Sequence, residues 1–190
     1  HEVLRELEPQ RKIVIGSNMW QSVNTFPDLV IPENDPNIIL SFHFYHPMVL
    51  THYKASWTPV GQYEGPVTYP GKVVPDSAIE KLSGDLRDRV ENWGGVYNID
   101  SMRSEIQPPL EYAKEHNLPL YCGEWGCLPT VPREARMAWY SDFRTVLEEN
   151  DIAWAHWDYK GGFGIVNREM ERDEGFIEVL LGDLTVIGDR

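Results

Sequence analysis

A single carboxylate ends the apolar stretch LPLYCGEWGCLP, which runs from Leu118 to Pro129. Glu124 follows a run of strand-forming residues and lies between Gly123 and Trp125. A carboxylate in this position can act as a nucleophile, a general acid or a general base, and such reactions normally need a second ionisable group. The stretch therefore predicts a catalytic or binding site at the end of a buried strand.

Other ionisable and aromatic side chains follow three further apolar runs. His43 and Tyr45 occupy alternate positions at the end of one run, so we expect them to share one face of a strand. Trp157 and Asp158 end another run, and Trp20 follows the first. Ionisable groups between aromatic walls form a pocket suited to sugars, because aromatic rings offer flat apolar surfaces.

Four apolar runs predict the strands that carry these residues: Arg11–Ser17, Asn37–Tyr45, Leu118–Glu124 and Ile152–Tyr159. The runs are nearly continuously apolar, as is typical of parallel strands buried on both faces. Apolar residues at three- and four-residue steps predict helices over Ala78–Trp93 and Pro132–Glu149, a last helix from near Gly175, and the end of an earlier helix over residues 1–8. We expect Thr130 to cap the second of these helices.

The alternation of strands and helices predicts an α/β fold with a parallel sheet, because parallel strands need helical crossovers. Four such units make half of an eight-stranded (β/α)8 TIM barrel, in which reactive groups follow the strands. One domain is expected over residues 1–190. It contains a long segment, 46–75, with little regular pattern and the aromatic residues Tyr53, Trp57, Tyr63 and Tyr69. We expect this segment to act as a lid or a substrate platform.

Composition excludes several partners. The net charge of −13 argues against nucleic acid and anionic membranes, and no apolar run approaches the roughly 18 residues needed to cross a bilayer. Cys122 and Cys127 are expected to be small buried residues, because neither a CxxC nor an HExxH spacing for zinc is present. The sequence leaves the cellular compartment open.

Three motifs together resemble the second half of a glycoside hydrolase family 5 enzyme of the cellulase type: SFHFYHP, LPLYCGEWG and AWAHWDYKGGFGIV. The resemblance covers nearly the whole chain. It implies strands five to eight of the barrel and a retaining, endoglucanase-like hydrolysis of β-1,4-glucosidic bonds that requires no cofactor. It also implies a β-glucan or aryl β-glycoside as substrate, and secretion.

The resemblance also assigns roles to individual residues. Glu124 corresponds to the catalytic nucleophile, while His43 and Tyr45 position the reacting groups and stabilise the charged form of that carboxylate. Trp157 corresponds to the ring that stacks on the sugar. Four further residues are expected to contact substrate: Trp125, Trp20, Trp57 and Asp158. For Asp158, helix capping is an equal alternative.

The family takes its acid/base glutamate from a position after the fourth strand, and this chain has no counterpart of it. We therefore expect either a homo-oligomer or a partner that supplies the N-terminal half-barrel, since an isolated half exposes two strand edges. The alternative is a catalytically weak or silent scaffold that binds sugar or a divalent metal. Imidazole and carboxylate groups suit such an ion, and the candidate ligands are His43, His46, His52 and Glu124. His46 and His52 fit loop or supporting positions better than catalytic ones.

Overall fold

The computed structural model describes residues 1–182 of the chain. Its main sheet has four parallel strands in the order β1-β2-β5-β6, as the sequence predicts. The strands are β1 (Ile13–Gly16), β2 (Ile38–Phe44), β5 (Leu120–Trp125) and β6 (Ala153–Trp154). The last is much shorter than expected. β3 (Gly71–Lys72) and β4 (Val96–Tyr97) form a separate antiparallel pair.

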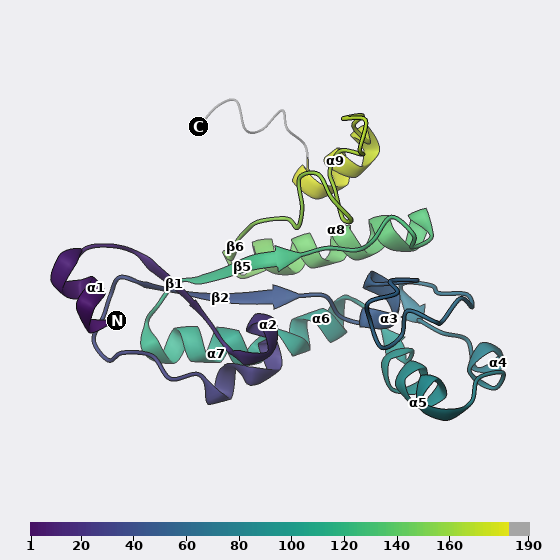
Figure 1. Ribbon diagram of the computed structural model, residues 1–190, viewed down its shortest axis with the longest axis horizontal. Coiled ribbons are helices and arrows are strands. Elements are labelled where there is room, and N and C mark those ends of the chain that lie inside the picture. Colours follow the sequence, from purple (N-terminus) through teal and green to yellow (C-terminus); the bar gives the residue numbers. More distant parts are fainter. Residues whose placement is uncertain (183–190) are drawn as a thin grey trace.

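Helices connect the strands and cover the sheet (Figure 1). Those before and between β1 and β2 are α1 (Glu2–Leu7), α2 (Asn18–Gln21) and the 3-10 helix η1 (Val23–Asp28). Those between β2 and β5 are α3 (Met48–Thr51), α4 (Asp76–Ile79), α5 (Gly84–Trp93), α6 (Ile99–Glu105) and α7 (Gln107–His116). The long helix α8 (Arg133–Glu149) joins β5 to β6, and α9 (Glu174–Leu181) follows β6. This succession is half of a β/α barrel.

The two faces of the sheet differ in burial. On one face Phe44 stacks on Phe143 of α8 with ring centroids 4.0 Å apart, and both side chains are fully buried. On the other face Val14 of β1 is 54% exposed. The sequence predicted burial of both faces. The difference arises because a barrel interior is filled by side chains from all of its strands, and four strands supply only part of that filling.

Two helix predictions need correction. The stretch 78–93 is not one helix, because Gly84 has φ +58°, a left-handed conformation that interrupts the helix between α4 and α5. Helices α6 and α7 were not predicted from the sequence. The side chain of Asn98 caps α6, and Pro108 lies in the first turn of α7, where a missing N–H is harmless.

The predicted cap of α8 is also wrong. Thr130 does not bond to that helix; its hydroxyl donates to the Tyr53 carbonyl at 2.5 Å. The helix begins after Pro132 without a side-chain cap. Thr130 therefore ties the start of α8 to the segment after β2.

The segment after β2 lies beyond the carboxyl ends of the strands (Figure 1). Its tyrosines Tyr53, Tyr63 and Tyr69 are buried in the core, so they are not the platform that the sequence predicted. Trp57 differs from them, with 68% of its surface exposed. The segment is thus a folded cap that extends the main core, because its aromatic side chains pack inward.

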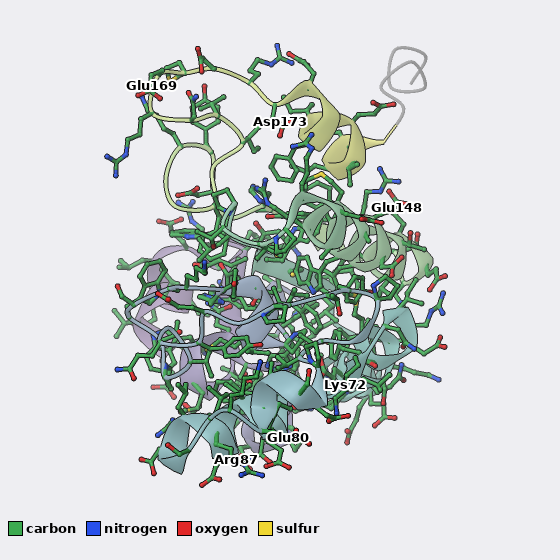
Figure 2. All side chains as sticks on the ribbon, turned by 90° about the vertical axis from the view of Figure 1, so that its right-hand side faces the viewer. Lys72, Glu80, Arg87, Glu148, Glu169 and Asp173 are labelled. Atoms are coloured by element: carbon green, nitrogen blue, oxygen red, sulfur yellow. The ribbon has the colours of Figure 1, made fainter. Side chains whose placement is uncertain are left out.

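Figure 2 views the molecule from the side at which the strands end. Glu80 and Arg87 of the α4–α5 region lie at one end of this view, and Glu169 and Asp173, which precede α9, lie at the other. In the part of the chain that the structure describes, no helix combines the length and the apolar character needed to cross a membrane. Both cysteines are free and buried.

Candidate active site at the strand ends

Glu124 is oriented by an irregularity in the sheet. Phe42 of β2 pairs with Cys122, but the next residue, His43, pairs with Glu124, so that Gly123 is an extra residue in β5. Such a bulge reverses the alternation of side chains beyond it. As a result Glu124 lies on the same face as His43, and Trp125 turns to the face covered by helices.

A glycine is needed at this bulge. A Cβ atom on Gly123 would lie 2.9 Å from Ser41 Oγ and 3.4 Å from His43 Nε2. The first distance is shorter than real Cβ contacts allow, and Ser41 is itself buried. The absence of a side chain therefore lets the backbone before Glu124 pass close to β2.

Two side chains from β2 converge on one oxygen of Glu124. The hydroxyl of Tyr45 donates to Glu124 Oε2 at 3.0 Å, and His43 Nδ1 lies 3.4 Å from the same atom. Parallel strands bring their carboxyl ends to one edge of a sheet, and alternation places both partners on one face. The structure thus brings together the three residues predicted for catalysis.

The electrostatics of this group follow from partial burial beside a carboxylate. Burial and the neighbouring charge of Glu124 raise the pKa of Tyr45 well above its usual value, so that the phenol stays protonated and donates its hydrogen bond. Burial lowers the pKa of His43, although the charge of Glu124 acts in the opposite direction. The side chain of Glu124 remains 27% exposed, so the carboxylate is reachable from the open face.

His52 supports Tyr45 from behind. Its ring meets the Tyr45 ring edge-on with centroids 5.1 Å apart. The hydroxyl of Thr51 donates to the Tyr45 carbonyl at 2.6 Å and lies 3.0 Å from His52 Nδ1. Since that single hydroxyl proton is used, His52 Nδ1–H must be the donor to Thr51. The sequence offered Thr51 no distinguishing signal, because its role depends on a turn that brings it back to Tyr45.

Burial gives His52 a testable pH effect. It lowers the pKa of His52 to about 4 from an ordinary 6.5, so the folded protein resists protonation where the unfolded chain accepts it. The stabilisation is complete above pH 6.5 and is lost as the pH falls toward 4, a difference of about 3 kcal/mol in the free energy of unfolding. Burial also lowers the pKa of His156 to about 4, which adds to the same pH window.

We expect His52→Leu to reduce this loss of stability, measured by urea unfolding at neutral pH and at the acid end of the window. His116→Leu is the control, because His116 lies on the exposed surface and should leave the slope unchanged. An equal pH dependence in the His52→Leu variant would contradict the prediction.

The two tryptophans at the ends of β5 and β6 that were predicted to stack on sugar differ in their exposure to solvent. Trp125 is fully buried among Trp139, Phe143 and Trp154, so it cannot stack on a ligand, and that prediction is wrong. Trp157 is 46% exposed, and its backbone N–H donates to the Trp125 carbonyl at 3.1 Å, which holds it beside the end of β5.

The remaining candidates surround the same rim. Trp20 is 83% exposed and follows β1, two residues before the bridge that Ser22 makes with His43. The Trp57 ring lies beside the His52 ring, with centroids 6.5 Å apart, and His52 in turn packs against Tyr45. Asp158 is not a helix cap, since the helix after β6 is capped by Asp173.

Asp158 is folded into its own loop. Its Oδ1 is buried without a hydrogen-bond partner among residues 1–182. A Cβ atom on Gly161 would lie 2.0 Å from its Oδ2, so a side chain at position 161 would displace this carboxylate.

The four candidate metal ligands do not form a metal centre in the described part of the chain, where no group of three or more His, Cys, Asp and Glu side chains could hold an ion. His43 does approach Glu124. His46, however, lies against Glu105 at 3.1 Å, and His52 against Thr51. The expectation of a metal site fails because the rings of His46 and His52 are held by Glu105 and Thr51 instead of converging with His43 on Glu124.

Comparisons with known proteins agree with this arrangement. A family model described as Cellulase (glycosyl hydrolase family 5) matches residues 1–162. Endoglucanase C of Acetivibrio thermocellus is 31% identical over 160 residues, which cover 84% of this chain and 46% of that protein. Endoglucanase 3 of Fibrobacter succinogenes is 25% identical over 172 residues, covering 87% and 26%.

Solved structures show the same fold. A hyperthermophilic endo-beta-1,4-glucanase in complex with substrate superposes with a TM-score of 0.72 at 26% identity, covering 94% of this chain and 50% of that one. The cellulose synthase subunit Z from Clostridioides difficile gives 0.74 at 23% identity, covering 95% and 52%. The chain thus spans about half the length, or less, of the proteins that it matches.

Proposed function

This chain belongs to glycosyl hydrolase family 5, and from that membership we propose that it forms the nucleophile half of a retaining β-1,4-glucan hydrolase. The observation that carries the proposal is the convergence of Tyr45 and His43 on Glu124 Oε2. This contact orients the carboxylate and leaves Oε1 without a partner among residues 1–182. The names of the relatives, which are endoglucanases, support glucan as the substrate.

In the proposed reaction Glu124 Oε1 attacks the anomeric carbon and forms a glycosyl ester, while the bond to the leaving-group oxygen breaks. An acid about 5 to 5.5 Å from Glu124 protonates that oxygen in a retaining enzyme. Water then hydrolyses the ester and regenerates Glu124. Trp157, Trp20 and Trp57 bind the sugar rings along the rim, and Asp158 shapes the loop that carries Trp157.

The experiment that tests the function is hydrolysis of an aryl β-cellobioside, followed by proton NMR of the anomeric signal. The β anomer is expected first, because two displacements retain configuration. The phenolate leaves without much protonation, so this substrate depends least on the acid. EDTA is expected to leave the rate unchanged. An initial α anomer would contradict retention, and absence of hydrolysis would favour a silent sugar-binding scaffold.

Substrate preference needs its own comparison. We propose β-1,4-glucan rather than mannan, on the relatives' names alone. Release of reducing ends from a soluble cellulose derivative should exceed release from a soluble mannan. The reverse order would assign the site to mannan.

We also propose that another half-barrel completes the site. The outer strands β1 and β6 each have an unpaired edge in the described part of the chain, and unpaired edges invite pairing. Light scattering is expected to give twice the mass of one chain if a second copy supplies the other half. A monomer at all concentrations would rule out a second copy as the source of the other half.

A further inference from the structure

A cavity of about 400 Å³ lies beside the end of β2. Its lining includes Asn24, His46, Asn92, Trp93, Gly95 and Glu105. These residues come from segments far apart in the sequence: η1, the turn after β2, the α5–β4 region and α6. The volume falls within the usual range of small-molecule sites, about 300–1,000 Å³.

The cavity lies on the other side of β2 from Glu124. His46 packs against Phe44 with ring centroids 5.5 Å apart, and Phe44 belongs to the face covered by α8. His43 and Tyr45, which alternate with Phe44 and His46 along the chain, point to Glu124 instead. His46 lies three positions after His43, which at about 3.3 Å per residue is on the order of 10 Å. The cavity is therefore distinct from the Glu124 site but close to it.

Glu105 is held in the cavity wall by two contacts to one oxygen. The Tyr97 hydroxyl donates to Glu105 Oε2 at 2.5 Å, and His46 Nδ1 lies 3.1 Å from the same atom. Burial raises the pKa of Tyr97, and the charge of Glu105 raises it further, so Tyr97 stays a donor. With Nδ1 of His46 directed at the carboxylate, its Nε2 is left for a second hydrogen bond.

Several polar atoms of this wall are unused within residues 1–182. They are Glu105 Oε1, His46 Nε2 and the side-chain amides of Asn24 and Asn92. The carboxylate accepts hydrogen bonds, while the imidazole nitrogen and the amides offer partners for a hydroxyl group, which can both donate and accept. Trp93, with 37% of its surface exposed, adds a flat apolar wall.

The polar and apolar groups of the cavity wall indicate which class of ligand it can bind. A metal ion would need further carboxylates, and Glu105 is the only one in the wall. An anion would be repelled by Glu105, and an apolar ligand would bury its polar partners unsatisfied. A neutral ring bearing hydroxyl groups satisfies all of them, since its hydroxyls donate to the acceptors and its apolar face covers Trp93.

We propose that this cavity is a second carbohydrate-binding site, which holds a gluco-oligosaccharide at the rim apart from Glu124. The choice of glucose units rests on the proposed function, whereas the site itself rests on the cavity and its lining. A long glucan can contact both sites, because they lie at the same end of β2.

The test uses the indole N–H signals of the seven tryptophans in 15N-labelled protein, titrated with cellotetraose. The Trp93 and Trp157 signals are assigned from their loss in Trp93→Phe and Trp157→Phe. Movement of the Trp93 signal is expected. If only Trp157 responds, the second site is refuted and the proposed function stands. A response of Trp93 alone supports the second site and counts against the proposed function, and no response of either refutes both.

A blocking variant locates the binding in the cavity. A Cβ on Gly95 meets no atom within 4 Å, so Gly95→Leu adds a side chain in open space at the cavity wall. The dissociation constant read from Trp93 is expected to rise about tenfold, with the Trp157 response unchanged. Gln62→Leu is the control, because Gln62 is exposed and lies outside the cavity lining, so the constant read from Trp93 should stay unchanged. An unchanged constant in Gly95→Leu overturns the proposal.

Discussion

Glu124→Gln is expected to slow hydrolysis of an aryl β-cellobioside by about 10³-fold or more. The amide keeps the shape of the carboxylate, and its oxygen can still accept the hydrogen bond that Tyr45 donates at 3.0 Å. It lacks the negative charge that attacks the anomeric carbon. The loss should therefore appear in the rate of the chemical step, measured with saturating substrate, while the urea unfolding curve stays close to that of the unchanged protein.

A matched control is available on α8. The carboxylate of Asp142 accepts a hydrogen bond from the Tyr69 hydroxyl at 2.7 Å, so Asp142→Asn makes the same chemical change at a second tyrosine–carboxylate pair. It should leave hydrolysis unchanged. Equal rates for Glu124→Gln and the unchanged protein would show that bond cleavage proceeds without Glu124.

A rescue experiment separates a chemical role of Glu124 from a structural one. Glu124→Ala leaves space beside Tyr45 and His43, and added azide is expected to restore cleavage by attacking the anomeric carbon directly. The product is then a glycosyl azide of inverted configuration, because only one displacement occurs. A structural role would give no such product.

Trp125→Ala is expected to lower the free energy of unfolding by about 3–5 kcal/mol. Trp125 is fully buried and packs on Trp154 and Phe143, with ring centroids 5.1 and 5.4 Å away. Its removal leaves a cavity between β5 and α8 that these large rings cannot close. Urea unfolding followed by circular dichroism measures the effect.

The control for this change is an exposed ring of the same type. Trp57→Ala removes a side chain that is 68% exposed, and its effect on stability should stay within about 0.5 kcal/mol. A Trp125→Ala protein of unchanged stability but weakened sugar binding would restore the platform role that burial argues against.

Much of the site follows from local rules. Alternation along β2 predicts that His43 and Tyr45 share a face, and the family resemblance predicts that they act on Glu124; both side chains contact it. The parallel sheet and α8 follow in the same way, from apolar runs and helical spacing. The shared face of His43 and Tyr45, the strands and α8 depend on residues near in sequence, whose periodicity is visible directly.

Other features depend on contacts that no periodicity reveals. The paired prolines at the start of α7 conceal a helix, because Pro usually ends one. The tyrosines of the segment after β2 looked like a platform, and only its folding shows that they fill a core. The wall around Glu105 draws on distant segments, so their proximity is a property of the fold.

The surroundings of Gly123 separate what the sequence indicates about the site from what the fold adds. The sequence indicates that a glycine and a carboxylate end a buried strand, and the family motifs indicate which carboxylate. The directions of Glu124 and Trp125 depend on the fold, because a one-residue shift in strand pairing reverses every side chain beyond it. That shift depends on the close approach of β2 to Gly123, a contact between residues about 80 positions apart in the chain.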